Sequence, residues 1–271
     1  MSHFHTALGL GLIGIGKPWG HVPRPVPTDA EAQSLLEFAW QLGVRYFDTA
    51  PSYGPRLSEQ RLGRFVDSLD AEQRRGIVIA TKLGEHWDRA KGEPYADHSC
   101  EALRRSLDES IEALGRIDIL QLHKTTPQAL RSDAVARIFE EARDLGARVG
   151  PSVSDRESAN IAVRDPGYSV IQLPYNRDNT AFAPIITAAR HMHVAVNRPF
   201  AMGAMIHSGA DKSDAFRFVL DAGFNGVVLT GTTNHDHLRE NWEAFQQALA
   251  NPKPTPNLPS APPGTPPDPA S

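Results

Sequence analysis

Four side chains whose types suit proton transfer stand at or just after short apolar runs of this sequence: Asp48, Tyr53, Lys82 and His123. A tyrosine donates a proton usefully near neutral pH only if its pKa, about 10 when unperturbed, is lowered. A neighbouring Lys82 cation lowers the pKa of a phenol, and Asp48 can hold that cation by a charge-assisted hydrogen bond. His123 can orient a carbonyl oxygen and stabilise the negative charge that develops on it. The four residues therefore predict carbonyl reduction and lack only a source of hydride.

The elements that must position these residues alternate between short β-rich runs and longer amphipathic stretches, a pattern typical of a parallel α/β protein. The predicted strands are Leu10–Ile15, Val44–Asp48, Ile77–Thr81, Asp118–Leu122, Arg148–Val153, Val170–Leu173, His193–Asn197 and Gly226–Leu229. The predicted helices lie near 29–42, 58–68, 97–114, 131–145, 155–164, 180–191, 212–222 and 235–249. Eight such units favour a (β/α)8 TIM barrel over a doubly wound sheet. Residues that follow the strands of such a barrel share one face, so the four side chains are expected to converge.

Composition excludes several other classes of protein. The 271 residues carry 28 Lys and Arg against 32 Asp and Glu, a net charge of -4, so the chain offers no broad positive field for nucleic acid or an anionic membrane. The single cysteine, Cys100, cannot form an internal disulfide, and the first residues do not resemble a signal peptide. We expect a cytoplasmic protein, a monomer by default, whose partner is a small-molecule carbonyl substrate rather than a nucleic acid or a membrane.

A change in composition near the C-terminus sets the domain boundary. Residues 251–271 are rich in proline and hold almost no large apolar side chains, so they cannot bury enough surface to offset the entropy of ordering. We therefore predict one barrel domain over residues 1–250 and a proline-rich tail over 251–271 that is disordered.

From Leu8 to Phe245 the sequence resembles the aldo-keto reductase family. The resemblance is carried, in this order, by GLGLIGIG, FDTAPSYG, SEQRLG, IATKLG, DILQLH, SVSD, QLPYN, NRPFAMG and GTTNHDHLRENWEAF. It implies an NAD(P)-dependent enzyme that reduces an aldehyde or ketone to an alcohol, or runs the reverse oxidation. It also implies that Tyr53 is the general acid, that Lys82 and Asp48 lower its pKa, and that His123 orients the carbonyl group.

The resemblance further implies the residues that bind the nicotinamide cofactor. It assigns the carboxamide to Ser154, Asp155 and Gln172, and the adenosine half to Gly231, Thr232, Thr233, Asn234, His237, Glu240 and Asn241. Because Asn197 stands at the family's stacking position, Phe200 or Arg198 is expected to stack on the nicotinamide ring instead. A GTTN run that opens a helix also suits a phosphate group, because it presents backbone amides and hydroxyls to an anion.

The sequence departs from the family at some of these positions. Asp155 stands where the family commonly has Asn, and Asn197 stands where many members stack an aromatic ring. Gly231 and His237 replace basic residues that often bind a 2′-phosphate, and Arg239 can substitute for them. NADPH is the expected cofactor, with NADH possible.

Substrate contacts and alternative functions rest on fewer residues. Trp19, His21 and Trp87 follow predicted strands and either line a substrate pocket or simply pack over the barrel. The histidine pairs His3 with His5 and His191 with His193 do not stand at carboxyl ends of strands, so no catalytic metal is expected. Two other functions stay open: a Schiff-base aldolase that uses Lys82, and a nicotinamide-binding regulatory subunit with little turnover.

Overall fold

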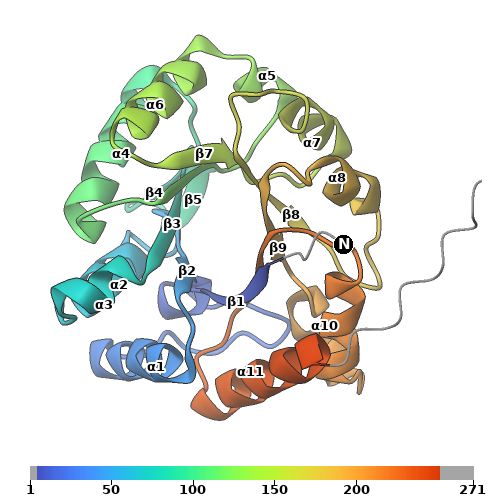
Figure 1. Cartoon of the computed structure of the whole chain (residues 1–271). Helices are drawn as coiled ribbons and strands as arrows, with labels where there is room; N and C mark the ends of the chain where they lie inside the picture. The colour runs from blue at the N-terminus through green and yellow to red at the C-terminus, as the bar shows by residue number, and fades with distance from the viewer. Residues whose placement is uncertain (1–4, 251–271) are drawn as a thin grey trace, which may run out of the picture.

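The computed structural model describes residues 5–250, which form a barrel of eight parallel strands surrounded by helices (Figure 1). The hydrogen-bonded strand order is β7-β6-β3-β2-β1-β10-β9-β8. These strands are β1 (Thr6–Gly11), β2 (Tyr46–Asp48), β3 (Val78–Leu83), β6 (Ile119–Leu122), β7 (Arg148–Pro151), β8 (Val170–Pro174), β9 (His193–Asn197) and β10 (Gly226–Thr230). A parallel bridge between Ser152 and Gln172 joins β7 to β8 and closes the barrel. The predicted fold is confirmed.

Each barrel strand is followed by at least one helical segment, as the (β/α)8 pattern requires. The longer helices are α1 (Asp29–Leu42), α2 (Leu57–Asp67), α4 (Cys100–Leu114), α6 (Asp133–Asp144), α7 (Arg156–Ala162), α8 (Ala183–Ala188), α10 (Lys212–Leu220) and α11 (His235–Ala250). The shorter ones are η1 (Ile13–Ile15), α3 (Ala71–Arg75), α5 (Pro127–Leu130), η2 (Ala201–Gly203) and α9 (Ala204–His207). All eight predicted helices are present, with ends that differ by a few residues.

Helix α4 shows how local sequence fixes an element. Ser99 caps its first turn by accepting a hydrogen bond from the backbone N–H of Ala102. Leu103, Leu107 and Leu114 recur at helical spacing and are buried against the barrel. Gly115 ends the helix with a φ of 74°, a conformation that favours glycine.

The core has an outer part between strands and helices and an inner part inside the barrel. Two clusters join buried residues of the strands to those of the surrounding helices. A third cluster brings together side chains from β2, β3, β6, β8, β9 and β10, among them Tyr46, Ile119, Val170 and Val227. Contributions from six strands place this cluster in the barrel interior, so the barrel is packed and not a pore.

The predicted first strand, Leu10–Ile15, is wrong. The observed strand β1 begins at Thr6 and pairs with β10 from Thr6 to Leu10. The chain then leaves the sheet, and Ile13–Ile15 form the 3-10 helix η1. The apolar residues of this segment have a composition typical of a strand, which explains the wrong prediction. Gly14 and Gly16 weaken the β propensity of the segment.

Besides η1, six elements of the described chain have no counterpart in the predicted set of long units: α3, α5, η2, α9, β4 (Glu85–Asp88) and β5 (Glu93–Ala96). Helices α3 and α5 are too short to give a helical period. The strands β4 and β5 form an antiparallel hairpin between β3 and α4. The hairpin extends the loop after β3, so the residues that begin it enter the same end of the barrel as Lys82.

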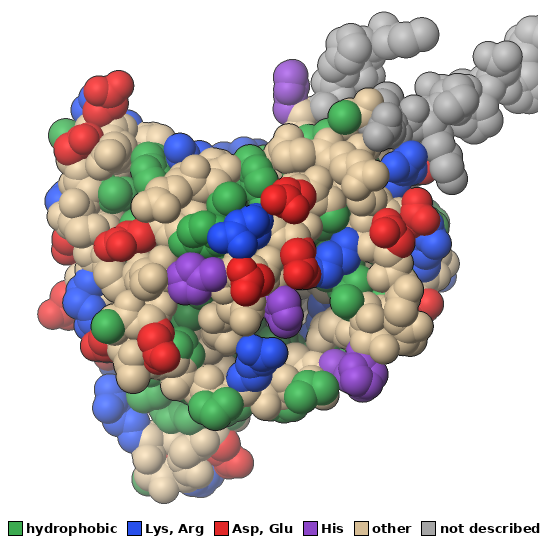
Figure 2. All heavy atoms as spheres, turned by 90° about the horizontal axis from the view of Figure 1, so that it is seen from below, with side chains coloured by type: hydrophobic (Ala, Val, Ile, Leu, Met, Phe, Trp, Pro, Cys, Tyr) green, Lys and Arg blue, Asp and Glu red, His purple; other side chains and the backbone are tan. Residues whose placement is uncertain are grey.

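The outer surface mixes charges of both signs. Figure 2 looks onto the side of the barrel that carries α1 and α11, where Lys and Arg side chains lie beside Asp and Glu side chains. Arg61 and Arg64 both pair with Asp29 on this side, and Arg239 pairs with Asp236.

Among residues 5–250, no helix is both long and apolar enough to cross a bilayer, and no three His, Cys, Asp or Glu residues gather as a candidate metal site. His3 and the tail 251–271 lie outside the described residues.

Gly63 of α2 provides a test of the packing between α2 and α4. A Cβ atom added at Gly63 lies 1.9 Å from the backbone oxygen of Ala113, so α2 must move away from α4 to accept it. We expect Gly63→Ala to lower the free energy of unfolding by about 3 kcal/mol in urea denaturation. Gly76→Ala is the control, because Gly76 has a helical φ of -78° and its added Cβ lies no closer than 3.3 Å to any atom. Equal stability of the two variants contradicts the packing argument.

Candidate active site

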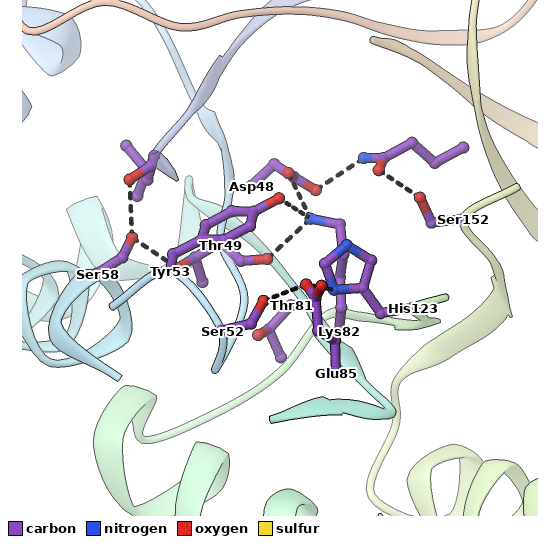
Figure 3. A network of polar contacts seen from close by, with 12 residues as sticks. Asp48, Thr49, Ser52, Tyr53, Ser58, Thr81, Lys82, Glu85, His123 and Ser152 are labelled. Carbon is purple, nitrogen blue, oxygen red and sulfur yellow. Dashed lines mark hydrogen bonds and ion pairs between the residues drawn. The ribbon is translucent and has the colours of Figure 1, made fainter. Parts of the chain in front are cut away.

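The predicted catalytic side chains gather at the carboxyl ends of neighbouring strands (Figure 3). Asp48 is the last residue of β2 and pairs in register with Ala80 of β3. Lys82 lies two residues further along β3, and His123 directly follows β6. Tyr53 lies in the loop between β2 and α2. The parallel register therefore brings together four residues that are up to 75 positions apart (48 to 123) in the sequence.

The ammonium group of Lys82 contacts three other groups of the site. Its Nζ donates hydrogen bonds to Asp48 Oδ2 at 2.6 Å, to the backbone oxygen of Thr49 at 2.9 Å and to the Tyr53 hydroxyl at 3.2 Å. The side chain is 1% exposed, so all three donors of the ammonium are satisfied inside the protein. Burial disfavours the charged form, but Asp48 and Tyr53 outweigh it and raise the pKa of Lys82 above its usual value.

Tyr53 keeps its proton in the resting protein. Burial raises the pKa of Tyr53, Lys82 opposes that effect, and the Asp48 and Glu85 carboxylates add to it. The pKa of Tyr53 is therefore above its ordinary value and not below it as expected, although Lys82 acts in the expected direction. The Lys82 cation still stabilises the phenolate relative to the same buried site without it, which is what a proton donor needs as it reacts.

Close backbone contact holds the Tyr53 loop in place. A Cβ atom at Gly16 lies 1.9 Å from the backbone oxygen of Tyr53, so only glycine fits there. Gly54 has a φ of 71°, and a Cβ atom added there would lie too close to the backbone oxygen of Gly16. The Ser58 hydroxyl accepts from Thr49 at 2.8 Å and donates to the backbone oxygen of Leu12 at 3.0 Å. These contacts fix the loop to the segment that follows β1.

A buried ion pair anchors the far end of this loop. Arg56 donates to Glu59 Oε2 at 2.7 Å, and the other oxygen of Glu59 accepts from Thr81 at 2.7 Å and from Ser110 at 2.9 Å. The cluster joins α2, β3 and α4. The sequence analysis missed it, because a Glu in a helix beside an Arg usually indicates a solvated face.

His123 contacts a carboxylate that the sequence analysis also missed. Its Nδ1 lies 3.1 Å from Glu85 Oε2, without the alignment of a hydrogen bond. Ser52 donates to the same oxygen at 2.5 Å, and Lys124 Nζ lies 3.0 Å from Oε1. Burial and the charge of Lys82 lower the pKa of His123 to about 3, with Glu85 opposing. One signal was available in the sequence: Glu85 is three residues after Lys82, in the segment that follows the predicted strand Ile77–Thr81.

Two of the three residues expected to bind the nicotinamide carboxamide, Gln172 and Asp155, have hydrogen-bond partners within the chain. Gln172 donates to Asp48 Oδ1 at 2.9 Å and accepts from the Ser152 hydroxyl at 2.8 Å. Asp155 caps α7 by accepting from the backbone N–H of Ser158 at 2.8 Å. Ser154 is exposed beside it. Of these residues, Gln172 is brought into the site, and Asp155 has the helix-capping role that competes with carboxamide binding.

The segment after β9 differs from expectation at Phe200. The Phe200 ring is 9% exposed and packs edge-on against Phe216 at a centroid distance of 4.8 Å, so it belongs to the core and is not free to stack on a nicotinamide ring. Arg198 is exposed and has a φ of 55°, and Ala201 and Met202 also have positive φ. Three such non-glycine residues in one short loop store backbone strain, which is common at ligand sites.

The loop from β10 to α11 contains the residues expected to contact the adenosine half. Asn234 caps α11 by accepting from the N–H of His237 at 2.9 Å, and its own N–H donates to Thr232 at 3.1 Å. Gly231 is exposed, Thr233 is partly exposed, and Asn241 is buried in α11. Glu240 pairs with Lys212 of α10 at 2.7 Å.

The expected substrate residues lie in two separate segments, the loop after β1 and strand β4 of the hairpin after β3. Trp19 is 44% exposed, and the neighbouring His21 donates its N–H to the oxygen of Met202 at 2.9 Å. Trp87 lies in β4, with the Lys17 ammonium 5.7 Å from its ring centre. The loop after β1 thus contacts both the segment after β9 and the hairpin after β3.

Comparisons with known proteins agree with this geometry. Residues 7–205 match the profile described as the aldo/keto reductase family. An L-galactose dehydrogenase from Arabidopsis thaliana is 37% identical over 122 residues, and a D-threo-aldose 1-dehydrogenase from a Pseudomonas species is 36% identical over 193 residues. These matches cover 44% and 62% of this chain but only 36% and 56% of those relatives. A solved structure of a putative aldo-keto reductase from Pseudomonas aeruginosa has a TM-score of 0.75 and 29% identity, over 89% of this chain and 90% of that one.

Removal of the Lys82 ammonium should destabilise the protein, because it leaves the Asp48 carboxylate buried without its counter-charge. We expect Lys82→Met to lower the free energy of unfolding by about 3 kcal/mol at pH 7, measured by urea denaturation. Lys91→Met, at an exposed position of the hairpin turn, is the control and should change stability by less than about 0.5 kcal/mol. A loss below about 1 kcal/mol in Lys82→Met argues that water reaches Asp48 in the folded protein.

Proposed function

Because the chain belongs to the aldo/keto reductase family, we propose that it transfers hydride between a nicotinamide cofactor and a small aldehyde or ketone, with Tyr53 as the proton donor. The observation that carries the proposal is the buried contact of the Lys82 ammonium with both the Tyr53 hydroxyl and the Asp48 carboxylate. A protonated phenol next to a fixed cation can give up its proton as negative charge forms on a carbonyl oxygen.

In the proposed proton transfer, the contacts of Lys82 with Asp48, Thr49 and Tyr53 are already formed. In reduction, Tyr53 donates its proton to the carbonyl oxygen, and Lys82 stabilises the phenolate that remains. In oxidation the phenolate accepts the hydroxyl proton of the alcohol. Asp48 and the Thr49 carbonyl keep the ammonium oriented in both directions. When bound, the reduced nicotinamide supplies the hydride to the carbonyl carbon.

Two features support a cofactor at this end of the barrel. Thr230 Oγ1 and Asn197 Oδ1, at the ends of the adjacent strands β10 and β9, are buried and have no hydrogen-bond partner among the described residues. The N-terminus of α11, a helix of 16 residues, follows immediately and suits a phosphate group. Gly231, Thr232, Thr233 and Asn234 would bind the phosphates, Gln172 and Ser154 the carboxamide, and His237, Glu240 and Asn241 the adenosine half.

The alternative functions fit the site less well. A Schiff-base aldolase needs a neutral lysine nucleophile, whereas ion pairing with Asp48 raises the pKa of Lys82 and keeps it charged. A regulatory subunit needs no proton donor, yet the Tyr53 hydroxyl is directly bonded to the ammonium. The relatives named above suggest aldoses as the first substrates to assay, together with pyridoxal, because a pyridoxal 4-dehydrogenase from Microbacterium luteolum is 33% identical over 143 residues.

Substitution of Tyr53 by phenylalanine tests the proton donor. Tyr53→Phe removes only the hydroxyl, so we expect kcat to fall by about 10³-fold while the Kd for the cofactor changes by less than about twofold. Steady-state kinetics with an aldose and fluorescence titration of the cofactor measure the two quantities. Tyr46→Phe is the matched control, because the Tyr46 hydroxyl lies in the inner core without a hydrogen-bond partner among the described residues. Undiminished turnover in Tyr53→Phe excludes the mechanism.

Calorimetric titration with NADPH and NADH tests the cofactor and its 2′-phosphate. We expect micromolar binding of NADPH and weaker binding of NADH, with Arg239 on the exposed face of α11 as the phosphate contact. Arg239→Ala should weaken NADPH binding by about tenfold and leave NADH binding within about twofold. If Arg239→Ala weakens the binding of NADPH and NADH equally, another residue contacts the 2′-phosphate. If the wild type binds neither cofactor, the proposed function is contradicted.

A further inference from the structure

Lys17 brings an ammonium group to the proposed catalytic site that the proton transfer by Tyr53 does not use. It directly follows Gly16, whose backbone packs against that of Tyr53, and its own N–H donates to the backbone oxygen of Ile13 at 2.9 Å. These contacts fix the backbone of Lys17 beside the Tyr53 loop. The side chain extends to the β4–β5 hairpin, where the ammonium lies 5.7 Å from the ring centre of Trp87.

The Lys17 ammonium differs from the other two ammonium groups of the site, because it has no counter-charge. Lys82 pairs with Asp48 at 2.6 Å, and Lys124 pairs with Glu85 at 3.0 Å. Among residues 5–250, the Lys17 ammonium has neither an ion pair nor a hydrogen-bond partner. Three ammonium groups thus face two carboxylates, and one positive charge is left over at the site.

The charge of Lys17 acts on His123 at the centre of the site. Figure 3 shows the His123 ring beside the Lys82 ammonium and the Glu85 carboxylate. Burial and Lys82 lower the pKa of His123 most, and Lys124 and Lys17 act in the same direction. Coulomb interactions weaken with distance and are small across bulk water, so the ammonium of Lys17 lies close to His123 in partly buried space. A carbonyl compound held by Tyr53 and His123 is therefore within its field.

Partial burial makes the unpaired ammonium of Lys17 costly. Burial lowers the pKa of Lys17, and the Glu85 carboxylate opposes that effect from beyond ion-pair distance. The Trp87 ring lies near the outer limit of a cation–π contact, about 6 Å. Asp88, the other acid of β4, pairs with Lys91 at 3.8 Å. The described chain thus supplies no anion for Lys17, whereas an anion bound beside it would favour the charged form.

We propose that Lys17 binds an anionic group of the substrate, so that the enzyme acts on aldehydes or ketones that also carry a carboxylate or a phosphate. This inference rests on the proposed function and narrows its substrate class. The ammonium donates a charge-assisted hydrogen bond to the anion, while the carbonyl group of the same molecule lies at Tyr53. Because the anion does not change during hydride transfer, this bond strengthens substrate binding and leaves the chemical step as it is.

Paired substrates test the anion site in the active enzyme. The first pair is 4-oxobutanoate and its methyl ester, which share the aldehyde and differ in the charge of the other end. The second pair is glycolaldehyde phosphate and glycolaldehyde. We expect the wild type to prefer the charged member of one pair by about tenfold in kcat/KM. Preference in the first pair identifies a carboxylate and preference in the second a phosphate, whereas no preference in either pair overturns the proposal.

Lys17→Met removes the charge and keeps the length of the side chain. We expect the preference for the charged substrate to fall to about twofold or less, because KM for that substrate rises while kcat changes by less than about twofold. Lys17→Arg keeps the charge and should keep the preference. Lys91→Met, which loses a charge from the exposed hairpin turn, should match the wild type. A preference that survives in Lys17→Met overturns the proposal.

The phosphates of the cofactor are the other anions within the proposed site. Calorimetric titration with NADPH should give Kd values for the wild type and Lys17→Met that agree within about twofold. Binding of NADPH that is about tenfold weaker in Lys17→Met assigns Lys17 to the cofactor and overturns the proposal.

Binding of the alcohol products separates this inference from the proposed function. We titrate 4-hydroxybutanoate and 2-hydroxyethyl phosphate into the protein by calorimetry with NADPH present, so that no turnover is possible. One of the two should bind about tenfold more weakly to Lys17→Met than to the wild type and Lys91→Met. If no carbonyl compound is reduced at all, the proposed function fails, and this titration still decides the role of Lys17. Equal binding to Lys17→Met and the wild type, or no binding to the wild type, overturns the inference.

Discussion

The need to satisfy one buried ammonium group organises this end of the barrel. Lys82 has three donors and is almost completely removed from water, so three acceptors must reach it from the protein. Two of them, Asp48 and the Thr49 carbonyl, come from the end of β2, and the third is the Tyr53 hydroxyl. An error in the β2–β3 register or in the Tyr53 loop leaves a buried charge without partners, which is far more costly than the loss of a surface contact.

The other contacts of the site extend this constraint outward. Asp48 also accepts from Gln172, which connects β2 across the barrel to β8. Gly16 and Ser58 hold the Tyr53 loop against the segment after β1. The loop is thus fixed by backbone contact on one side and by the Arg56–Glu59 pair on the other. The phenol is positioned before any ligand arrives, so little ordering entropy remains to be lost when a substrate binds.

The sequence predicts the parts of the molecule that follow from periodicity and position. Alternating strands and helices led to the barrel, and the rule that functional residues follow strands brought Asp48, Lys82 and His123 together correctly. Short elements gave no such pattern. The β4–β5 hairpin carries Glu85, and its contact with His123 depends on the path of a loop, which residue types alone do not encode. Phe200 could not be assigned from sequence either, since its core role depends on where Phe216 of α10 lies.

The closure of the barrel between β7 and β8 has a consequence for heat inactivation. Six of the seven other neighbouring strand pairs align three to five residues, whereas at this seam Ser152 aligns with Gln172 and the backbone N–H of Ser169 donates to the oxygen of Val149 at 3.0 Å. Regions held by fewer backbone hydrogen bonds open at lower free energy than the rest of a structure. Gln172 is also the residue that contacts Asp48, so opening of the seam detaches a partner of the Lys82–Asp48 pair. Loss of activity on warming should therefore precede loss of helical structure.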